Sequence, residues 1–522
     1  MITSIDTRFT LILSLSAIAI ALVDRLARKK RATGGLPLPP GPTGLPIVGS
    51  LLSLDSRGAF YTYLDWAATY GDLVYAKFLK EEIIIINSRK IAVELLEKRS
   101  NNYSDRPYLA ALIPFGWNFN FGNAHYGDYW RVRRKLFHQT FRPESVAKFR
   151  PMQLTKVHQL LANMLDESAH YVDHLESYTA SIAMAAVYGY ETKPRNDPLV
   201  AIANKAIFGP LKVLAPEGTA LVNAFPFLLR LPNWFPGATI ARNARSSYYN
   251  IQDMIDAPHA LVQKKMINGT ETPSLVSDML QRLEEEEPEN KPAFEKILKD
   301  VSSTTIAAAS ESSTAVLVVF VLAMVMHPEV QERARAQIDA VVGSDRLPDF
   351  EDRESLPYID AILWESMRWE PVTPIALPHS NTTSDVYEGY FIPKGATIVA
   401  NAWAMSRDES VYPNASEFQP ERWLTSDGQL NGDEPPNFVF GWGRRICPGR
   451  HAADATMWVA ICSLLANFDF QKAKDSRGKT IDFKPTFTAG FVRLPDPFPS
   501  HIVPRPGFNS DKLAHLIRMA SI

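Results

Sequence analysis

Apolar residues along most of this chain recur at intervals of three and four, which is the spacing of one buried face of an α-helix. The pattern predicts helices over residues 60–70, 90–99, 142–165, 173–188, 246–266, 294–326, 328–342, 356–369 and 451–465. Residues 72–87 contain runs typical of β-strands, LVYAKF and EEIIIIN, joined by a turn at 80–82. The expected fold class is therefore mainly α with a minor β domain.

The long predicted helix at 294–326 has an unusually apolar second half. Residues 315–326 read AVLVVFVLAMVM and leave the helix without a polar face. A bilayer-spanning helix needs about 20 apolar residues, so this run is too short to cross a membrane. A helix that is apolar all round is normally covered by protein on every side. We therefore expect a buried helix at the centre of the fold.

The N-terminal segment predicts a membrane anchor. Residues 9–23 are apolar, flanking residues extend the run to position 27, and the basic cluster Arg28–Arg31 follows directly. Basic residues stay on the cytosolic side of a membrane, so residues 1–27 should form a single transmembrane helix with a cytosolic body behind it. A cleaved secretory signal is the alternative, but its small-residue cleavage sites lie inside the apolar run.

Residues 28–50 join this anchor to the body and form a basic and proline-rich hinge. The stretch 36–46 reads LPLPPGPTGLP, and each proline holds its backbone φ at about −65°. Such a segment is a stiff, extended spacer that sets the angle of the body. The rest of the chain, residues 51–522, is expected to be one catalytic domain.

Composition narrows the classes of function. The 522 residues include 55 lysines and arginines against 57 aspartates and glutamates, so the chain lacks the positive charge that dominates nucleic-acid binding. Its two cysteines, Cys447 and Cys462, are too few for a disulfide framework and are not spaced as zinc ligands. We expect a folded protein of a reducing compartment with no nucleic-acid partner.

The segment Phe440–Arg450 holds the candidate chemistry. It reads FGWGRRICPGR and places Cys447 among glycines and arginines, just before a predicted helix. A thiol beside arginines at a helix N-terminus is expected to ionise readily, because both features stabilise a thiolate. The glycines allow the backbone to approach a flat ligand closely. Cys462 lies inside an apolar helix and is expected to be an ordinary core residue.

Phe440, Gly443, Arg445, Cys447 and Gly449 resemble the haem-binding signature of the cytochrome P450 family, F-x-x-G-x-R-x-C-x-G. The resemblance implies the cytochrome P450 fold, with the long central helix over the haem. It also implies that Cys447 is the thiolate ligand of the iron in haem b. Phe440, Arg445 and Gly449 are then further cofactor-binding residues.

Three other residues resemble a structural triad of the same family. Glu365 and Arg368 form an i,i+3 pair on a predicted helix, and such a pair alone is common and contributes little. Arg422 follows 54 residues after Arg368 and 25 residues before Cys447 (422 − 368 and 447 − 422). This order and spacing resemble the family's Glu-Arg-Arg triad. The resemblance implies structural support of the cysteine loop.

Further haem contacts follow from the resemblance. Trp130 and Arg134 have the family's W-x-x-x-R spacing and would donate hydrogen bonds to a haem propionate. Arg445 and His379 are the other expected donors, although a lone histidine is alternatively a satisfied core or surface residue.

Three more basic residues, Arg131, Arg133 and Lys135, lie between and beside these propionate contacts. They suit a solvated helix face, and such a face would meet an acidic redox partner.

Glu311 and Ser312 are the candidate catalytic residues. They occupy the acid and alcohol positions of a family pattern, matched here by Ala308–Ser313 (AASESS). The resemblance implies a proton relay, and a carboxylate within an apolar helix is costly unless it serves such a purpose. The chain departs from the family with Ala309 in place of glycine and Ser312 in place of threonine. The alternative is a structural role in which Glu311 and Ser312 satisfy each other.

The resemblance implies a haem-thiolate monooxygenase that inserts one oxygen atom from O2 into a C–H bond of a small hydrophobic substrate, such as a fungal terpenoid or polyketide. A separate NADPH–cytochrome P450 reductase would supply electrons, with cytochrome b5 as a second donor. The protein would be a monomer in the endoplasmic reticulum membrane. Residues 115–121, 372–376 and 488–491 would wall the pocket, and residues 225–236 would contact lipid. The alternatives are a haem-thiolate peroxide isomerase or peroxygenase, and a non-enzymatic haem carrier or sensor.

Overall fold

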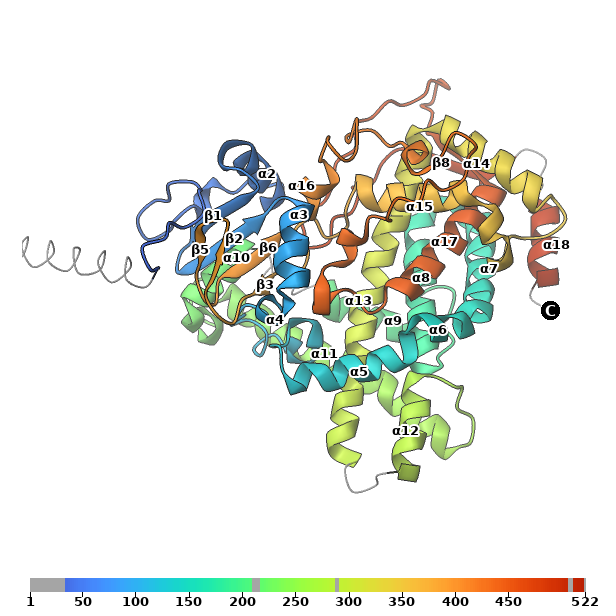
Figure 1. The fold of residues 1–522 in the computed structure, drawn as a ribbon. Helices are drawn as coiled ribbons and strands as arrows, with labels where there is room; N and C mark the ends of the chain where they lie inside the picture. Colours follow the sequence, from blue (N-terminus) through green and yellow to red (C-terminus); the bar gives the residue numbers. More distant parts are fainter. Residues whose placement is uncertain (1–32, 209–215, 287–290, 506–509, 521–522) are drawn as a thin grey trace, which may run out of the picture.

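The computed structural model of the chain describes residues 33–208, 216–286, 291–505 and 510–520. The predicted anchor at residues 1–27 lies outside the described residues, as do the first five residues of the predicted hinge, 28–32. Figure 1 shows a sheet-containing lobe, which holds the early part of the chain, beside a larger helical lobe. The predicted class, mainly helical with small sheets, is confirmed.

Helix α13 (Lys291–Met326) runs through the middle of the helical lobe, as Figure 1 shows. All its side chains from Ala315 to Val325 are buried. The helix lacks a polar face because protein covers it on every side, as predicted. Among the described residues, the part of this helix from Pro292 to Met326 alone is long and apolar enough to cross a membrane. Because most of that stretch is covered by protein, α13 is a core helix of the fold.

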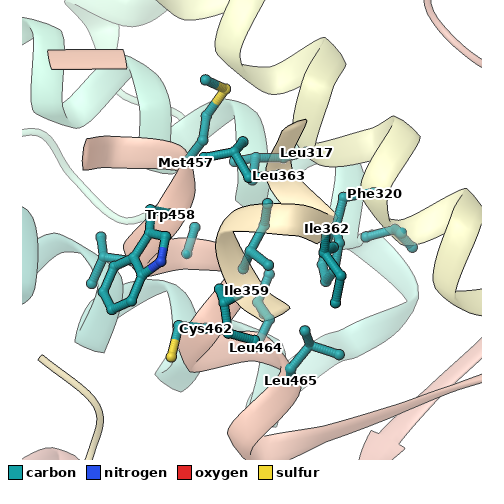
Figure 2. Close-up of a cluster of buried hydrophobic side chains, with 14 of the residues drawn as sticks. Leu317, Phe320, Ile359, Ile362, Leu363, Met457, Trp458, Cys462, Leu464 and Leu465 are labelled. Carbon is teal, nitrogen blue, oxygen red and sulfur yellow. The ribbon is translucent and has the colours of Figure 1, made fainter. Parts of the chain in front are cut away.

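Three helices meet in the buried cluster drawn in Figure 2. Leu317 and Phe320 come from α13, Ile359 from α15 (Pro357–Trp369), and Trp458 and Cys462 from α17 (Arg450–Asn467). Each of these five residues is 0% exposed, so the three helices pack closely against one another. Burial of each large apolar side chain contributes about 1.5–3 kcal/mol. The cluster therefore forms a rigid frame behind the cysteine loop.

The main sheet has the order β1-β2-β6-β3. Strands β1 (Leu73–Phe78) and β2 (Glu81–Ile86) form the predicted antiparallel hairpin, while β6 (Thr397–Ala400) pairs parallel to β2 and antiparallel to β3 (His379–Ser380). Ile83 and Ile85 pack in a cluster with helix α2 (Ala59–Tyr70), and Ile84 and Ile86 pack in a different cluster. Four isoleucines occur in a row because both faces of this strand are covered.

The remaining elements surround this frame. Two small sheets pair β4 with β5 and β7 with β8; the strands are β4 (Asp385–Tyr387), β5 (Tyr390–Ile392), β7 (Phe468–Lys472) and β8 (Ser500–Pro504). The other helices are α3 (Arg89–Ala92), α4 (Ser100–Tyr103), α5 (Asp128–Phe141), α6 (Pro143–Val146), α7 (Arg150–Glu167), α8 (Tyr171–Tyr188), α9 (Pro198–Phe208), α10 (Pro216–Ala224), α11 (Thr239–Ile267), α12 (Leu275–Glu286), α14 (Pro328–Val341), α16 (Ala402–Ser406) and α18 (Ser510–Ala520).

One predicted helix, 142–165, is wrong in its boundaries. The structure divides this segment into α6, a 3₁₀ turn at Ala147–Phe149, and α7. Pro143 and Pro151 each occupy the first turn of one of these helices, where the missing N–H has no cost. The helical spacing of apolar residues continues across this turn, so the sequence pattern did not indicate the boundary between the two helices.

Glu365 on α15 is the centre of a fully buried ionic network. Arg368 donates from Nε to Oε2 at 2.8 Å and from Nη2 to Oε1 at 2.7 Å, while Arg422 donates from Nε to Oε1 at 3.1 Å. The indole of Trp423 donates to Oε2 at 3.0 Å. The structure thus brings the three residues of the predicted triad together around one carboxylate.

Arg368 uses its other donors to hold the segment that leads to the cysteine loop. Its Nη1 donates to the carbonyls of Ser406 and Ala415, both at 2.8 Å, and its Nη2 donates to the carbonyl of Glu417 at 3.0 Å. A bidentate, fully buried guanidinium of this kind has strict geometric requirements. The network therefore ties α15 to residues 406–423.

Replacing Glu365 by alanine should destabilise the protein by about 3–5 kcal/mol, because Arg368 would keep its buried charge and lose its carboxylate. Urea unfolding followed by far-ultraviolet circular dichroism measures the change. Glu329→Ala is the matched control, since the Glu329 side chain is 69% exposed at the start of α14. Equal losses in the two variants would contradict this role of the network.

Candidate active site

A cavity of about 500 Å³ lies between the cysteine loop, α13 and the sheet-containing lobe. Cys447 and Gly449 line it from the loop, and Ala308, Glu311 and Ser312 line it from α13. Ala308 is exposed although α13 runs through the core, so this face of the helix borders the cavity. The cavity therefore brings the predicted metal ligand and the predicted catalytic residues to one space.

The cysteine loop has a closely fixed backbone. The Cys447 N–H donates to the carbonyl of Phe440 at 2.7 Å, which closes the loop just before α17. Gly443 has a φ of 53°, and a Cβ there would lie 2.2 Å from the carbonyl oxygen of Leu96. Only glycine fits at that position. A Cβ on Gly449, by contrast, would lie 4.0 Å from the Cys447 sulfur, an ordinary contact beside the cavity.

The ionisation expected of Cys447 does not follow from the protein alone. Burial raises the pKa of the thiol, although the Gly449 N–H and the charges of Arg134 and Arg450 act in the opposite direction. The arginines and the loop N–H groups act in the predicted direction, and burial of the thiol opposes them. A metal cation at the sulfur would supply the missing stabilisation.

Arg445 reaches the cavity from the same loop. Its Nε donates to the carbonyl of Ser104 and its Nη2 to the carbonyl of Ala124, both at 2.7 Å. Its Nη1 is buried and has no acceptor among the described residues. Burial lowers the pKa of the guanidinium to about 10, and Asp105 opposes that shift. A buried cation with an unused donor is stabilised by an acceptor in the cavity, and most strongly by an anion.

Arg134 and Trp130 project from α5 into the same cavity. The Arg134 guanidinium lies 6.0 Å from the centroid of the Trp130 ring. Within the described part of the chain, neither side chain has a hydrogen-bond acceptor. Burial lowers the pKa of Arg134, while Cys447 acts to raise it. Both side chains are therefore available to an acceptor inside the cavity.

His379 also lines the cavity, from strand β3. Its Nδ1 donates to the carbonyl of Tyr103 at 2.7 Å, which leaves Nε2 as the free ring nitrogen. Burial lowers the pKa of His379 well below its usual range, and the charges of Arg106 and Arg445 lower it further. The imidazole is neutral in the protein alone, and a neighbouring carboxylate would favour its protonation.

Sequence reasoning missed Arg106, a buried cation on the edge of the cavity. Its Nε donates to the carbonyl of Gly122 at 2.9 Å, and its Nη1 donates to the carbonyls of Leu377 and Pro378, both at 2.7 Å. It thereby joins the loop before α5 to the segment that carries His379. No spacing or periodicity in the sequence singles out this residue.

These residues fit the haem that the resemblance implies. Haem b carries two propionate carboxylates and an iron that accepts a thiolate. Unused donors on Arg134, Arg445 and Trp130 surround a cavity that also exposes the Cys447 sulfur. The orphaned Nη1 of Arg445 is the observation that supports the fit most directly.

Glu311 has an environment suited to holding a proton. Burial, together with the charge of Glu176 on α8, raises the pKa of the Glu311 carboxyl to about 7. No described residue donates a hydrogen bond to this carboxyl. The Ser312 hydroxyl donates to the carbonyl of Ala308 at 2.8 Å. The structural alternative, in which Glu311 and Ser312 bond each other, is therefore not what the structure contains.

The predicted basic face of α5 is only partly exposed. Arg131 and Lys135 are exposed, but Arg133 is buried and donates to Oδ2 of Asp300 on α13 from Nε at 2.9 Å and from Nη2 at 2.6 Å. The placement of Arg133 on a solvated face is wrong, because an acid more than 160 positions later pairs with it. That ion pair instead joins α5 to the central helix.

The predicted pocket walls line the cavity in part. Trp117, Phe121 and Phe491 do so, as does most of the segment 372–376. Phe119 packs into the core instead. Several other residues of the predicted walls do not line the cavity. The alternation of core and lining residues within one short loop has no signal in the sequence.

Most of the chain resembles known proteins of one family. The family model for cytochrome P450 matches residues 39–500. A cytochrome P450 monooxygenase of Armillaria gallica is 36% identical over 496 residues, which cover 93% of this chain and 96% of that relative. The cytochrome P450 monooxygenases COX2 of Coprinopsis cinerea and claR of Ampulloclitocybe clavipes are also 36% identical, over 90% and 92% of this chain and 90% and 88% of their own lengths.

Glu311 should make stability depend on pH. Its pKa is about 7 in the folded chain and 4.5 ordinarily, so its contribution is complete below pH 4.5 and is lost as the pH rises through 7. Urea unfolding from pH 4.5 to 7.5 should show Glu311→Gln gaining about 1–3 kcal/mol on the wild type as the pH rises. Glu354→Gln, at an exposed position, is the control, and its difference from the wild type should stay constant. Parallel profiles for wild type and Glu311→Gln would contradict the pKa shift.

Proposed function

This chain belongs to the cytochrome P450 family and is a monooxygenase, and from that premise we propose that it inserts one oxygen atom from O2 into a C–H bond of a small hydrophobic substrate. The family implies haem and O2. The single observation that carries the proposal is the cavity itself, which is lined by Cys447, by arginines with unused donors and by Glu311. Neither a structural cysteine nor a simple apolar pocket would need that combination.

The residues that would hold the haem all line the cavity. Cys447 would ligate the iron, and Arg134, Arg445, Trp130 and His379 would bind the propionates through the donors described above. Phe440 and Gly449 would complete the cysteine loop, whose closed backbone and small residue leave the sulfur accessible. When bound, the haem would supply O2 activation and transfer of one oxygen atom to the substrate.

Glu311 and Ser312 would deliver protons within the cavity. With a pKa of about 7, the Glu311 carboxyl is divided between its protonated and ionised forms at neutral pH, so it both releases and regains a proton readily. The Ser312 hydroxyl, now bonded to the Ala308 carbonyl, could rotate to pass that proton on. Ala309 adds a methyl group on the same helix face.

A hydrophobic substrate is supported by the walls of the cavity. Apart from the groups assigned to haem and to proton transfer, the lining is dominated by aromatic and aliphatic side chains such as Trp117, Phe121 and Val372. The fungal source of the relatives supports a secondary metabolite, for example a terpenoid or a polyketide. Among the described cationic residues that line the cavity, Arg134 and Arg445 would hold the propionates, and Arg106 is bonded to backbone carbonyls, which does not favour an acidic substrate.

A separate NADPH–cytochrome P450 reductase would supply electrons, with cytochrome b5 as an alternative donor. The family generally uses a redox partner. The outer face of α5 supports its docking here, because exposed Arg131 and Lys135 lie on the helix whose inner face presents Arg134 to the cavity. Positive charge at that surface would attract an acidic partner. We propose that the protein acts as a monomer.

The membrane arrangement is proposed from sequence and surface together. Residues 1–27 would anchor the chain in the endoplasmic reticulum membrane, 28–50 would form the hinge, and 51–522 would be the cytosolic haem-thiolate domain. Within the predicted lipid contact at 225–236, Phe227 is 60% and Trp234 is 79% exposed. Large apolar side chains this exposed suit a lipid surface.

The two cysteines provide a matched test of the function. Cys447→Ala should abolish the long-wavelength ferrous–CO Soret band of thiolate-ligated haem, together with NADPH-dependent product formation in the presence of a reductase. Cys462→Ala should retain both, because Cys462 is buried in the core of Figure 2. Product analysis after co-expression with a reductase would identify the substrate. A histidine-type spectrum in the wild type would contradict thiolate ligation, and product formation without NADPH would indicate a peroxide isomerase or peroxygenase.

The lipid contact makes a separate prediction. In protein lacking residues 1–27, the double variant Phe227→Asp/Trp234→Asp should bind phosphatidylcholine vesicles at least about tenfold more weakly, since two apolar side chains would no longer enter the lipid. Vesicle flotation measures the binding. Val411→Asp is the control, as Val411 is 51% exposed outside the predicted contact. Equal binding by all three proteins would exclude the proposed surface.

A further inference from the structure

Asn223 on α10 joins three segments that are far apart in the sequence. Its Oδ1 accepts a hydrogen bond from the N–H of Ala110, and its Nδ2 donates to the carbonyl of Tyr108, both at 2.8 Å. The same Nδ2 donates to Oε1 of Glu81, the first residue of β2. One amide therefore connects α10, the loop at 108–110 and the edge of the main sheet. Figure 1 shows α10 beside the strands of that sheet.

The same three segments form one end of the cavity. Glu81, Leu109 and Thr219 line it, one from each segment. Tyr108, next to Leu109, is 67% exposed, and Leu221, two positions after Thr219, is 39% exposed. The loop and α10 therefore each have residues that line the cavity and residues that face solvent. On the opposite side, the buried cluster of α13, α15 and α17 covers the cavity.

The apolar contacts of α10 are small. Of its residues whose side chains are described, Ala220 and Val222 are the ones that are buried, and they belong to two different clusters. Ala220 packs with the sheet and Val222 packs with the cluster that contains α11. Ala224 adds one partly buried contact with the sheet cluster. Because these apolar contacts are small, the three hydrogen bonds of Asn223 form a large part of what holds α10 to the 108–110 loop and to the sheet.

We propose that Asn223 is a specificity-determining residue that latches α10 to the 108–110 loop and to Glu81, so that bulky ligands reach the cavity only when the latch opens. A small ligand passes between the segments through side-chain fluctuations, whereas a large one requires the segments to separate. This inference deepens the proposed function, because it assigns the entrance through which its substrate passes.

The test compares two ligands of different size on the full-length holoenzyme. Imidazole and 4-phenylimidazole bind haem iron, and stopped-flow absorbance reports their association rates without turnover. In Asn223→Ala, association of 4-phenylimidazole should accelerate roughly tenfold, because the hydrogen bonds that oppose opening are removed. Imidazole should be unaffected. The control is Asn163→Ala, which removes a surface amide of α7 that is bonded to Gln159.

A second measurement does not depend on haem. The N–H of Ala110 donates a hydrogen bond to Asn223 in the wild type. In Asn223→Ala this amide hydrogen should exchange roughly tenfold faster, which mass spectrometry of peptides covering residues 107–112 would measure. Glu81→Ala removes one arm of the latch and serves if Asn223→Ala does not fold; Glu81→Gln keeps an acceptor and should behave as wild type. In the double variant Asn223→Ala/Glu81→Ala the effects should be less than additive.

The outcomes separate the latch from the proposed function. An unchanged ratio of the two association rates in a correctly folded Asn223→Ala or Glu81→Ala protein would overturn the assignment of the entrance. Faster exchange at Ala110 without a change in that ratio would also overturn it, because the contact would then be structural only. If the protein binds no haem, the proposed function is contradicted. Hydrogen exchange at the Ala110 amide would still test whether the latch holds the loop.

Discussion

Buried positive charge without a matching carboxylate is the constraint on which this site depends. Arg106, Arg134 and Arg445 border one cavity, and burial lowers the pKa of each guanidinium. Taking a cation out of water is costly unless an anion or hydrogen-bond acceptors replace the water. Backbone carbonyls do so for Arg106 and for most of Arg445. The propionates of a haem would supply acceptors for the remaining arginine donors, so binding of the cofactor would stabilise the buried charges.

The two sides of the cavity are held by different kinds of interaction. Behind the cysteine loop, Arg368 has its carboxylate from Glu365 and three backbone acceptors, all within a close-packed core. This arrangement needs no ligand and tolerates little movement. At the far end, Asn223 joins segments with few apolar contacts, and its neutral hydrogen bonds are each weak in net terms. A rigid wall thus positions the chemistry, while the more weakly held wall is the one through which we propose that ligands pass.

Local patterns predicted most of the large elements. The apolar run at 315–326 identified the buried central helix, and the isoleucine run identified strand β2, which the structure shows to be covered on both faces. The prediction was wrong at 142–165, where the apolar spacing continues through two prolines that begin new helices. Helix α10 was missed because it is short and has few buried apolar residues to produce a periodic pattern. Apolar periodicity indicates which face of an element is buried. It does not indicate where one helix ends and the next begins, or which polar side chains hold an element in place.

The sequence by itself determined the family, the central helix and the identity of Cys447 as the candidate metal ligand, because these depend on residue types at short, fixed spacings. Only the tertiary structure decided the charge state of the groups around that cysteine. The exposed face expected for Arg133 became a buried pair with Asp300, and Glu311 acquired its raised pKa from burial and from Glu176 on another helix. Burial and pairing depend on which distant segments meet, and that information is absent from any local stretch of sequence.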